Sequence, residues 1–283
     1  MTSKIVEVGG YTLHIRCVAG IESCCYVDSI DIAFDLGCLV DRVVCKSHVF
    51  ITHGHIDHIG AVMAHAARRA LNKQAPARYF MPAHLVPHLE CIFQNAAVMQ
   101  GDRPFPASFV PLQSFDEIHV SSKYVVRAVP TRHRVPSLGF IVYEKRNRLK
   151  QEYRQLPCQE IAALKRSGQE VTDSDLSPEI AYTGDTTIEA FRIAIIDKRM
   201  QDLLRVKVLI TEATYADVTI SDQVAFERGH MHLNQLATYE QLFEQVGAMV
   251  LVHFSARYSA TELAEYIRTL LPMSLRQKII LGC

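Results

Sequence analysis

The chain has 283 residues, 49% of them hydrophobic, which is enough to bury one large core or two modest ones. Its 30 basic and 30 acidic residues give a formal net charge of zero, which excludes a globally basic nucleic-acid binder but not local basic patches. No apolar run approaches the roughly 20 residues that span a bilayer, and MTSKIVEVGG at the start lacks the apolar core of a signal peptide. Eight cysteines without a C-x-x-C pair are typical of reduced core thiols. We therefore expect a non-secreted protein with no membrane contact, in the cytosol or, as the alternative, in the nucleus.

The first forty residues alternate apolar and polar side chains with period two, which predicts a meander of antiparallel strands. Helical spacing or helix formers then mark the segments at 59–71, 84–99, 188–204 and 233–246, and Ser259-x-x-Glu262 predicts a capped last helix. Further strands are expected at 47–51, 124–129 and 139–143, and before Asp185, Glu212 and His253. Strands first and then alternating strands and helices predict an α/β (α+β) fold, in which two sheets pack face to face with helices outside.

The composition changes from about residue 144 to 177, where the chain is charged and poor in large apolar residues. We expect a surface insertion there, helical in part, within a single domain that spans residues 1–283. Its basic residues, with others around His133, could form a patch that follows a phosphate backbone, and a solvated helix face is the alternative.

The stretch FITHGHIDHIG places His53, His55, Asp57 and His58 between a buried strand and a helix. Four unpaired polar groups in one buried turn would cost several kcal/mol without a metal or other partners. Imidazole nitrogens with a carboxylate are the ligands suited to zinc or a similar first-row metal. Because four ligands from one tight turn cannot all surround one ion, we expect two ions about 3.5–4 Å apart.

Such a site needs more ligands from distant strands, and the sequence offers His133, Asp185 and His253 at strand ends. Asp185 could bridge both ions, since each carboxylate oxygen can bind one. Alone, either histidine could equally lack a metal role, and the YTGDT turn could be an ordinary strand-to-helix turn with Thr186 as a cap.

The order H-x-H-x-D-H, an isolated histidine, an aspartate in a GDT turn and a late histidine resembles the metallo-β-lactamase superfamily, whose fold is an αββα sandwich. The strings AYTGDTT (181–187), TEATY (211–215), RGHMHLNQLA (228–237) and LVHFSARY (251–258) are similar to those of ribonuclease Z, the tRNA 3′-processing endonuclease, in its short form. This similarity covers nearly the whole chain.

The resemblance implies which residues bind metal. One zinc would be held by His53, His55 and His133, the second by Asp57, His58 and His253, and Asp185 would bridge them. Two Zn²⁺ are the expected cofactors, with Mn²⁺ or another divalent metal as the alternative. Precursor tRNA is the implied substrate, and a homodimer is the implied assembly.

The resemblance also implies a catalytic pair, Glu212 and His230, for phosphodiester hydrolysis. Asp57 would orient the attacking water and accept its proton, and His230 would protonate the departing 3′-oxygen while Glu212 fixes its tautomer. Thr186 and Arg257 are candidates for contact with the scissile phosphate, and a helix cap and a salt bridge are their alternatives.

Many ribonuclease Z proteins carry a long arm, rich in glycine and proline, that grips the tRNA elbow. Here only 51 residues separate His133 from Asp185, and Gly168 is the only glycine from 144 to 177, so a shortened arm is expected. Two other functions compete with the nuclease. One is a hydrolase of small esters, thioesters or lactones, and the other is a non-catalytic paralogue that binds RNA.

Overall fold

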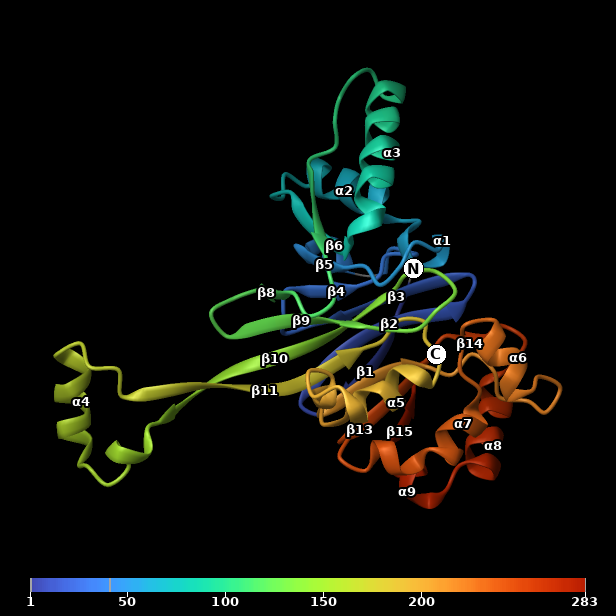
Figure 1. Ribbon diagram of the computed structural model, residues 1–283. Coiled ribbons are helices and arrows are strands. Elements are labelled where there is room, and N and C mark those ends of the chain that lie inside the picture. Colours follow the sequence, from blue (N-terminus) through green and yellow to red (C-terminus); the bar gives the residue numbers. More distant parts are fainter. Residues whose placement is uncertain (1, 41, 283) are drawn as a thin grey trace.

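The computed structural model describes residues 2–40 and 42–282, with its elements labelled in Figure 1. Two β-sheets lie against each other at the centre, and helices cover their outer faces (Figure 1). This architecture confirms the predicted class of two mixed sheets with helices outside.

The first sheet takes its strands from the N-terminal part of the chain, except for β14, which pairs with β2. Its members are β1 (Lys4–Val8), β2 (Tyr11–Ala19), β3 (Glu22–Val27), β4 (Ile32–Phe34), β5 (His48–Phe50), β6 (Ala77–Pro82), β7 (Ala107–Leu112) and β14 (Phe254–Ser255). Neighbours are antiparallel from β1 to β4, as the period-two pattern predicted, and parallel from β4 to β7. Along β2 every second residue is buried, because one face of the sheet packs on the core.

The second sheet has the order β15-β13-β12-β11-β10-β9-β8. Its members are β8 (Glu117–His119), β9 (Tyr124–Pro130), β10 (Leu138–Leu149), β11 (Thr172–Tyr182), β12 (Val208–Glu212), β13 (Ala248–Val252) and β15 (Ile279–Leu281). Strands β8 to β11 are antiparallel, and β11, β12, β13 and β15 are parallel. The fully buried runs of β12 and most of β13 fit parallel strands covered on both faces.

Helices flank both sheets. The α-helices are α1 (Ile56–Ile59), α2 (Val62–Leu71), α3 (Val86–Met99), α4 (Cys158–Arg166), α5 (Glu189–Ile196), α6 (Asp222–Glu227), α7 (Leu233–Thr238), α8 (Ala260–Leu270) and α9 (Met273–Arg276). The 3₁₀-helices are η1 (Val43–Cys45), η2 (Ala83–Leu85), η3 (Gln151–Tyr153), η4 (Gln201–Leu204) and η5 (Glu240–Phe243). In the part of the chain that the structure describes, none of the helices is both long and apolar enough to cross a membrane.

Three layers of buried side chains hold these elements together. Between the sheets, Phe34 of β4 stacks on Tyr182 of β11 with ring centroids 4.9 Å apart. Outside the first sheet, Val62 and Leu89 of α2 and α3 are buried, and outside the second sheet Phe191 of α5 lies in the same cluster as helices α7 to α9. Each fully buried aromatic or aliphatic side chain contributes about 1.5–3 kcal/mol, so both sheets gain stability on both faces.

Two predicted helices are interrupted. The segment 188–204 divides into α5 and η4, because Asp197 has an extended backbone (φ −86°, ψ 108°) and its carboxylate accepts a hydrogen bond from the backbone N–H of Arg199. The segment 233–246 divides at Tyr239 into α7 and η5. The capping box of Ser259 and Glu262 is present at the start of α8, as predicted.

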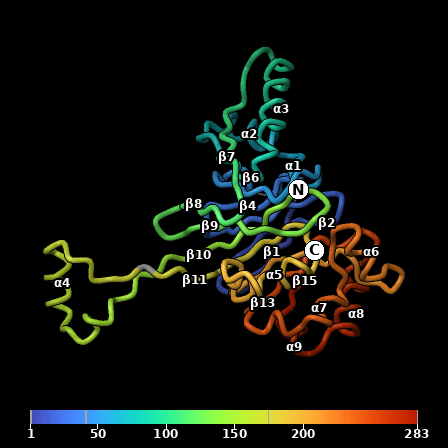
Figure 2. The backbone as a smooth tube through the Cα atoms, in the orientation of Figure 1, coloured from blue at the N-terminus to red at the C-terminus, as the bar shows by residue number. Residues whose placement is uncertain are grey.

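The insertion combines strands with a helix. Its two ends are not helical, since β10 and β11 continue outward as an antiparallel ribbon (Figure 2). The helical part is α4 at the tip, which confirms the expectation of a partly helical segment. We call the ribbon and its tip, residues 144–177, the arm.

Candidate metal centre

Polar side chains converge at one edge of the two packed sheets. Asp185 follows β11 and His253 follows β13, and these parallel strands bring their carboxyl ends to the same edge. His133 follows β9, which runs in the same direction as β11 because both are antiparallel to β10. His53 follows β5 of the facing sheet. The fold thus gathers residues that are up to 200 positions apart in the chain.

The first group contains His53, His55, His133 and Asp185, whose candidate ligand atoms all lie within 4.8 Å of one another. His55 Nδ1 is 3.0 Å from His53 Nε2 and 3.2 Å from His133 Nε2. Asp185 Oδ2 is 3.8 Å from His53 Nε2. Three imidazole nitrogens and one carboxylate oxygen are therefore close enough to share one cation.

The second group contains Asp57, His58 and His253. His253 Nε2 is 3.4 Å from both His58 Nε2 and Asp57 Oδ2. Asp185 Oδ1 is 3.3 Å from the Nε2 atoms of His58 and His253. Asp185 thus faces the first group with Oδ2 and the second group with Oδ1, which is the geometry that a bridging carboxylate needs.

Hydrogen bonds behind the rings determine which ring nitrogen carries the proton. The Thr52 hydroxyl donates to Asp35 Oδ2 at 2.9 Å, so it can only accept from His53 Nδ1, 3.0 Å away. His53 Nε2, inside the cluster, then carries a lone pair. His58 Nδ1 likewise donates to Asp35 Oδ2 at 2.8 Å. Asp35 therefore orients two of the rings from behind.

The same arrangement holds the rings on the opposite side. His133 Nδ1 donates to the carbonyl oxygen of Gly229 at 2.7 Å. The Thr214 hydroxyl donates to Glu212 Oε2 and so accepts from His253 Nδ1, at 3.2 Å. The Nε2 atoms of both histidines are left with lone pairs that point into the cluster.

Asp35 was not singled out by the sequence analysis. It follows β4 directly, is fully buried and has a left-handed backbone (φ 53°). Its carboxylate also accepts hydrogen bonds from Thr52 N at 2.8 Å and from the Tyr182 hydroxyl at 3.0 Å. The available signal was an aspartate that ends the strand-like run IDIAFD, in the same way that Asp185 and Glu212 end later strands.

These residues fit a divalent cation. Burial lowers the pKa of His53 to about 2, and burial also lowers the pKa values of His55 and His133, so the three rings are neutral ligands at pH 7. Burial opposes ionisation of Asp185, but the neighbouring His253 and His58 hold its pKa well below its usual range. Its buried Oδ1 has no hydrogen-bond donor among the described residues. Lone pairs that converge around an unsatisfied carboxylate oxygen repel one another unless a cation lies between them, and nitrogen with oxygen ligands suits zinc-like metals.

A second carboxylate and imidazole pair lies beside this cluster. Glu212 is fully buried, and its Oε1 accepts hydrogen bonds from His230 Nδ1 at 2.9 Å and from Thr186 N at 2.7 Å. Burial opposes a charge on His230, but the Glu212 carboxylate outweighs it and raises the pKa of His230 to about 9. Since Nδ1 is bonded to Glu212, Nε2 is the atom that His230 can offer to a substrate.

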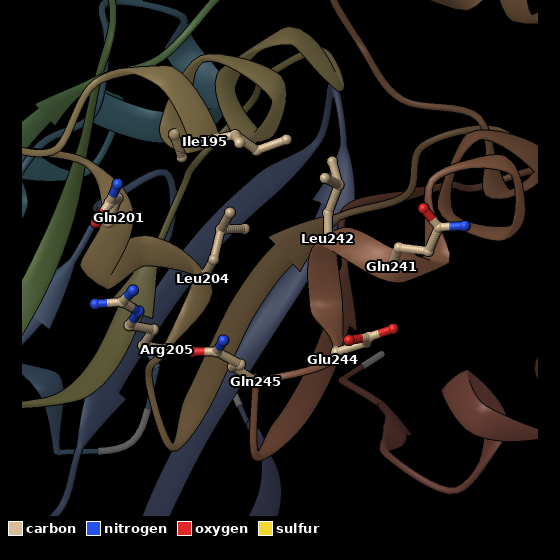
Figure 3. A pocket seen from close by; sticks show the side chains of 9 residues that line it. Ile195, Gln201, Leu204, Arg205, Gln241, Leu242, Glu244 and Gln245 are labelled. Carbon is tan, nitrogen blue, oxygen red and sulfur yellow. The ribbon is translucent and has the colours of Figure 1, made fainter.

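A hollow of about 260 Å³ opens onto the cluster and is lined by Gly20, His55, Ile56, Asp57, Arg134, Asp185, His230 and His253. A second hollow, of about 360 Å³, lies beside α5, η4 and η5 (Figure 3). The second hollow is lined by aliphatic and amide side chains with Arg205 and Glu244 and contains no histidine, cysteine or aspartate, so it lacks the ligands that a zinc site needs. The smaller hollow is therefore the candidate active site.

Relatives of known family decide the assignment. The chain is 34% identical over 269 residues to tRNase Z TRZ1 of Arabidopsis thaliana, an alignment that covers 95% of this chain and 94% of the relative. The chain belongs to the ribonuclease Z family. This confirms the family that the sequence motifs predicted, a family of endoribonucleases. No protein-family model matches the chain.

Solved structures agree on the fold of this ribonuclease Z family member. A metallo-β-lactamase fold protein from Bacillus subtilis superimposes with a TM-score of 0.60 at 13% identity, covering 95% of each chain. The human short form of tRNase Z superimposes with a TM-score of 0.52 at 18% identity, covering 99% of this chain and 92% of that one. The predicted metallo-β-lactamase sandwich is thereby confirmed.

The two candidate phosphate contacts differ in exposure. Thr186 is fully buried, and its hydroxyl accepts from Arg132 N at 3.2 Å and donates to the carbonyl oxygen of Thr187 at 3.2 Å. It therefore has no accessible surface for a phosphate and instead holds the loop beside Glu212. Arg257 has a side chain that is 44% exposed and lies 3.9 Å from Asp217, so its guanidinium can still turn towards a ligand.

Two basic residues of the arm are paired with acidic ones. In the ribbon, Arg146 and Arg148 of β10 stand opposite Asp175 and Asp173 of β11. Arg148 forms an ion pair with Asp175 at 3.5 Å. Exposed pairs of this kind leave little net field, so Arg146 and Arg148 add little to a basic patch, and a patch that follows a phosphate backbone stays a prediction for the other basic residues of the arm.

Proposed function

We propose that the protein is a zinc-dependent endoribonuclease that removes 3′ trailers from precursor tRNA and leaves a 3′-hydroxyl on the tRNA. The observation that carries this proposal is the hollow at the cluster. There Asp185 lies between two groups of candidate ligands, and the pair of buried Glu212 and His230 lies beside them. The name of the Arabidopsis relative, tRNase Z, supports tRNA as the substrate.

Two divalent ions are proposed, Zn²⁺ first and Mn²⁺ or another metal as the alternative. His53, His55 and His133 would hold one ion, Asp57, His58 and His253 the other, and Asp185 both. Bound there, the ions would supply a water of lowered pKa and positive charge next to the phosphoryl oxygens. The remaining chemistry belongs to side chains of the protein.

Asp57 is the proposed proton acceptor. Its Oδ2 accepts a hydrogen bond from the backbone N–H of Gly20 at 2.9 Å, and its side chain lines the hollow. Burial opposes its charge, but the neighbouring imidazoles of His253 and His58 lower its pKa, so it is ionised at pH 7. An ionised carboxylate at this place can orient the attacking water and remove its proton.

His230 is the proposed general acid. With its pKa raised to about 9, the ring is protonated at neutral pH, and Glu212 holds it so that Nε2 can donate to the departing 3′-oxygen. A ribose alkoxide is a poor leaving group, so its protonation in the transition state is worth about 100- to 10,000-fold in rate.

The arm is proposed to take the place of the family's tRNA-binding arm within a single metallo-β-lactamase domain, and the protein is proposed to act as a homodimer. We expect it in the cytosol, with the nucleus as the alternative compartment. Arg257 remains a proposed contact of the scissile phosphate.

The test compares two substrates, a precursor tRNA with a labelled 3′ trailer and bis(p-nitrophenyl) phosphate. The second substrate releases a good leaving group, so it does not need a general acid. Asp57→Ala should impair both reactions, whereas His230→Ala should slow tRNA cleavage by about 100-fold or more and the diester much less. His84→Ala, at an exposed histidine outside the site, is the matched control and should cleave both substrates normally.

Near-normal tRNA cleavage by His230→Ala would refute the general-acid assignment. Failure of the metal-loaded parent protein to cut tRNA, together with rapid hydrolysis of small esters, thioesters or lactones, would instead favour the small-molecule hydrolase. Tight tRNA binding without any hydrolysis would indicate a non-catalytic paralogue.

A further inference from the structure

The arm leaves the second sheet at an irregular point. Along β10 and β11, Val142 pairs with Ile180 but the next residue, Tyr143, pairs with Pro178, so Glu179 is the extra residue of a β-bulge. Bulges bend a ribbon and redirect the side chain of the extra residue. Here the redirected side chain is a carboxylate at the root of the arm.

The bulge lies where the ribbon loses its neighbouring strands. Strand β9 pairs with β10 only as far as Glu144, and β12 pairs with β11 only from Ile180 onward. Beyond these residues, in the described chain, β10 and β11 pair only with each other. A two-stranded ribbon twists and bends easily when it stands alone. The direction of the arm therefore depends on what holds its root.

The Glu179 carboxylate is fully buried and connects three parts of the molecule. Its Oε2 accepts a hydrogen bond from the Tyr11 hydroxyl of β2 at 2.9 Å and lies 2.5 Å from Lys207 Nζ, just before β12. Its Oε1 accepts from the guanidinium of Arg146 at 2.7 Å. Tyr11 and Lys207 belong to the two sheets of the body, and Arg146 belongs to the arm.

Arg146 continues the network on the arm side. Its Nε also donates to Glu144 at 3.0 Å, and Glu144 pairs with Lys123 at 2.8 Å, just before β9. Charge-assisted bonds to a planar guanidinium fix direction as well as distance. The arm is thus tied to both sheets through one buried carboxylate.

We propose that Glu179 is a positioning residue, which fixes the direction in which the arm leaves the body and thereby sets where the tip meets a long substrate. This inference rests on the proposed function, in which the arm contacts precursor tRNA. It predicts a selective defect. Loosening the root should weaken productive binding of tRNA, while a substrate too small to reach the arm should be hydrolysed as before.

Glu179→Gln would leave a buried amide beside two cations and can unfold the chain, so the decisive substitution is made on the arm side. Arg146→Met removes the link to the arm and leaves Glu179 paired with Tyr11 and Lys207. Arg148→Met is the matched control, because Arg148 is the next residue on the same face of β10 and, among the described residues, forms its ion pair across the ribbon and not with the root.

For precursor tRNA, Arg146→Met should raise KM about tenfold with little change in kcat, since a misplaced binding element costs affinity more than chemistry. Hydrolysis of bis(p-nitrophenyl) phosphate should be unchanged. Arg148→Met removes one positive charge from the same face of the arm without loosening its root, so it should raise KM much less than Arg146→Met does, and Arg146→Lys should recover part of the loss. Equal KM values for Arg146→Met and Arg148→Met would overturn the proposal.

A distance measurement tests the same idea without catalysis. Replacing Cys45 and Cys283 by serine leaves Cys91 on α3 and Cys158 at the tip as exposed cysteines for spin labels. The parent protein should give one narrow distance distribution, and Arg146→Met should broaden or shift it, whereas Arg148→Met should not. Identical distributions in all three proteins would overturn the role of the root. If no variant cleaves tRNA but the distributions differ as expected, the proposed function fails and the positioning role stands.

Discussion

Replacing Asp35 by asparagine should weaken metal binding although Asp35 is not itself a proposed metal ligand. The carboxylate accepts from Thr52 N and Thr52 Oγ1 at Oδ1, and from Thr52 Oγ1, His58 Nδ1 and the Tyr182 hydroxyl at Oδ2. An amide has one acceptor and one donor end. With its nitrogen at Oδ2 it faces His58 and Tyr182, and with its nitrogen at Oδ1 it faces the backbone N–H of Thr52.

The second orientation is the less harmful one, because the amide oxygen then still accepts from His58 and Tyr182. It removes a charge-assisted hydrogen bond, which contributes about 1.5–3 kcal/mol, and leaves the buried N–H of Thr52 against another donor, which costs about 1–3 kcal/mol. Asp35→Asn should therefore lose roughly 2.5–6 kcal/mol of folding free energy. The orientation of His53 and His58 weakens at the same time, and metal affinity should fall about 10- to 100-fold.

Two measurements check this. Chelator competition followed by elemental analysis gives the metal affinity. Denaturant unfolding of the metal-free protein gives the change in the free energy of unfolding separately. Asp31→Asn is the control, because Asp31 lies at the other end of β4 and has a half-exposed side chain that bonds Ser47 and His48. If Asp35→Asn binds metal as tightly as the Asp31→Asn control, the argument that Asp35 orients the histidines is wrong.

Three further predictions concern a buried histidine, a glycine beside a metal-ligand candidate and metal removal. Burial lowers the pKa of His65 to about 4, below the ordinary 6.5, so its contribution to stability is complete above pH 6.5 and is lost as the pH falls towards 4. Between pH 7.5 and 5.5 the free energy of unfolding, measured in urea, should fall by about 1 kcal/mol more for the parent protein than for His65→Gln, and equal falls would contradict this. Gly229→Ala should lower metal affinity about tenfold, because its Cβ would lie 2.7 Å from His133 Nδ1 in a left-handed backbone (φ +77°). Gly168→Ala, at φ +85° with open space around it, has a similar backbone strain without the clash, so its folding free energy should fall but its metal affinity should not. A comparable loss of metal affinity in Gly168→Ala would refute the steric account. Removing metal with a chelator should lower the melting temperature and abolish tRNA cleavage, and unchanged activity in a protein free of metal by elemental analysis would refute the metal centre.

The arm illustrates where reading the sequence fails. The composition of residues 144–177 correctly indicated a surface segment, and α4 is helical as expected. However, EKRNRL and TDSDLS form opposite strands of one ribbon, so the basic run on β10 is matched by an acidic run on β11. Charge along a sequence does not reveal cross-strand partners, because strand register depends on pairing between segments that are distant in the chain.

The sequence by itself determined the features that depend on local spacing. The crowding of polar residues at 53–58 indicated a candidate metal-ligand turn, because so many polar groups in one loop need a cation or partners. The capping box at Ser259 and the period-two strands are likewise set by neighbours in the chain.

The tertiary structure alone decided which residues that are distant in the chain contact one another. Asp35 supports His58 from 23 residues away and Tyr11 reaches Glu179 across 168 residues, contacts that no local pattern encodes. The bulge that turns Glu179 inward exists only once β10 and β11 pair, and Asp185 can face both ligand groups only once the two sheets pack. The physical reason is that these positions are fixed by packing between sheets, whereas a sequence pattern reports only the preferences of adjacent residues.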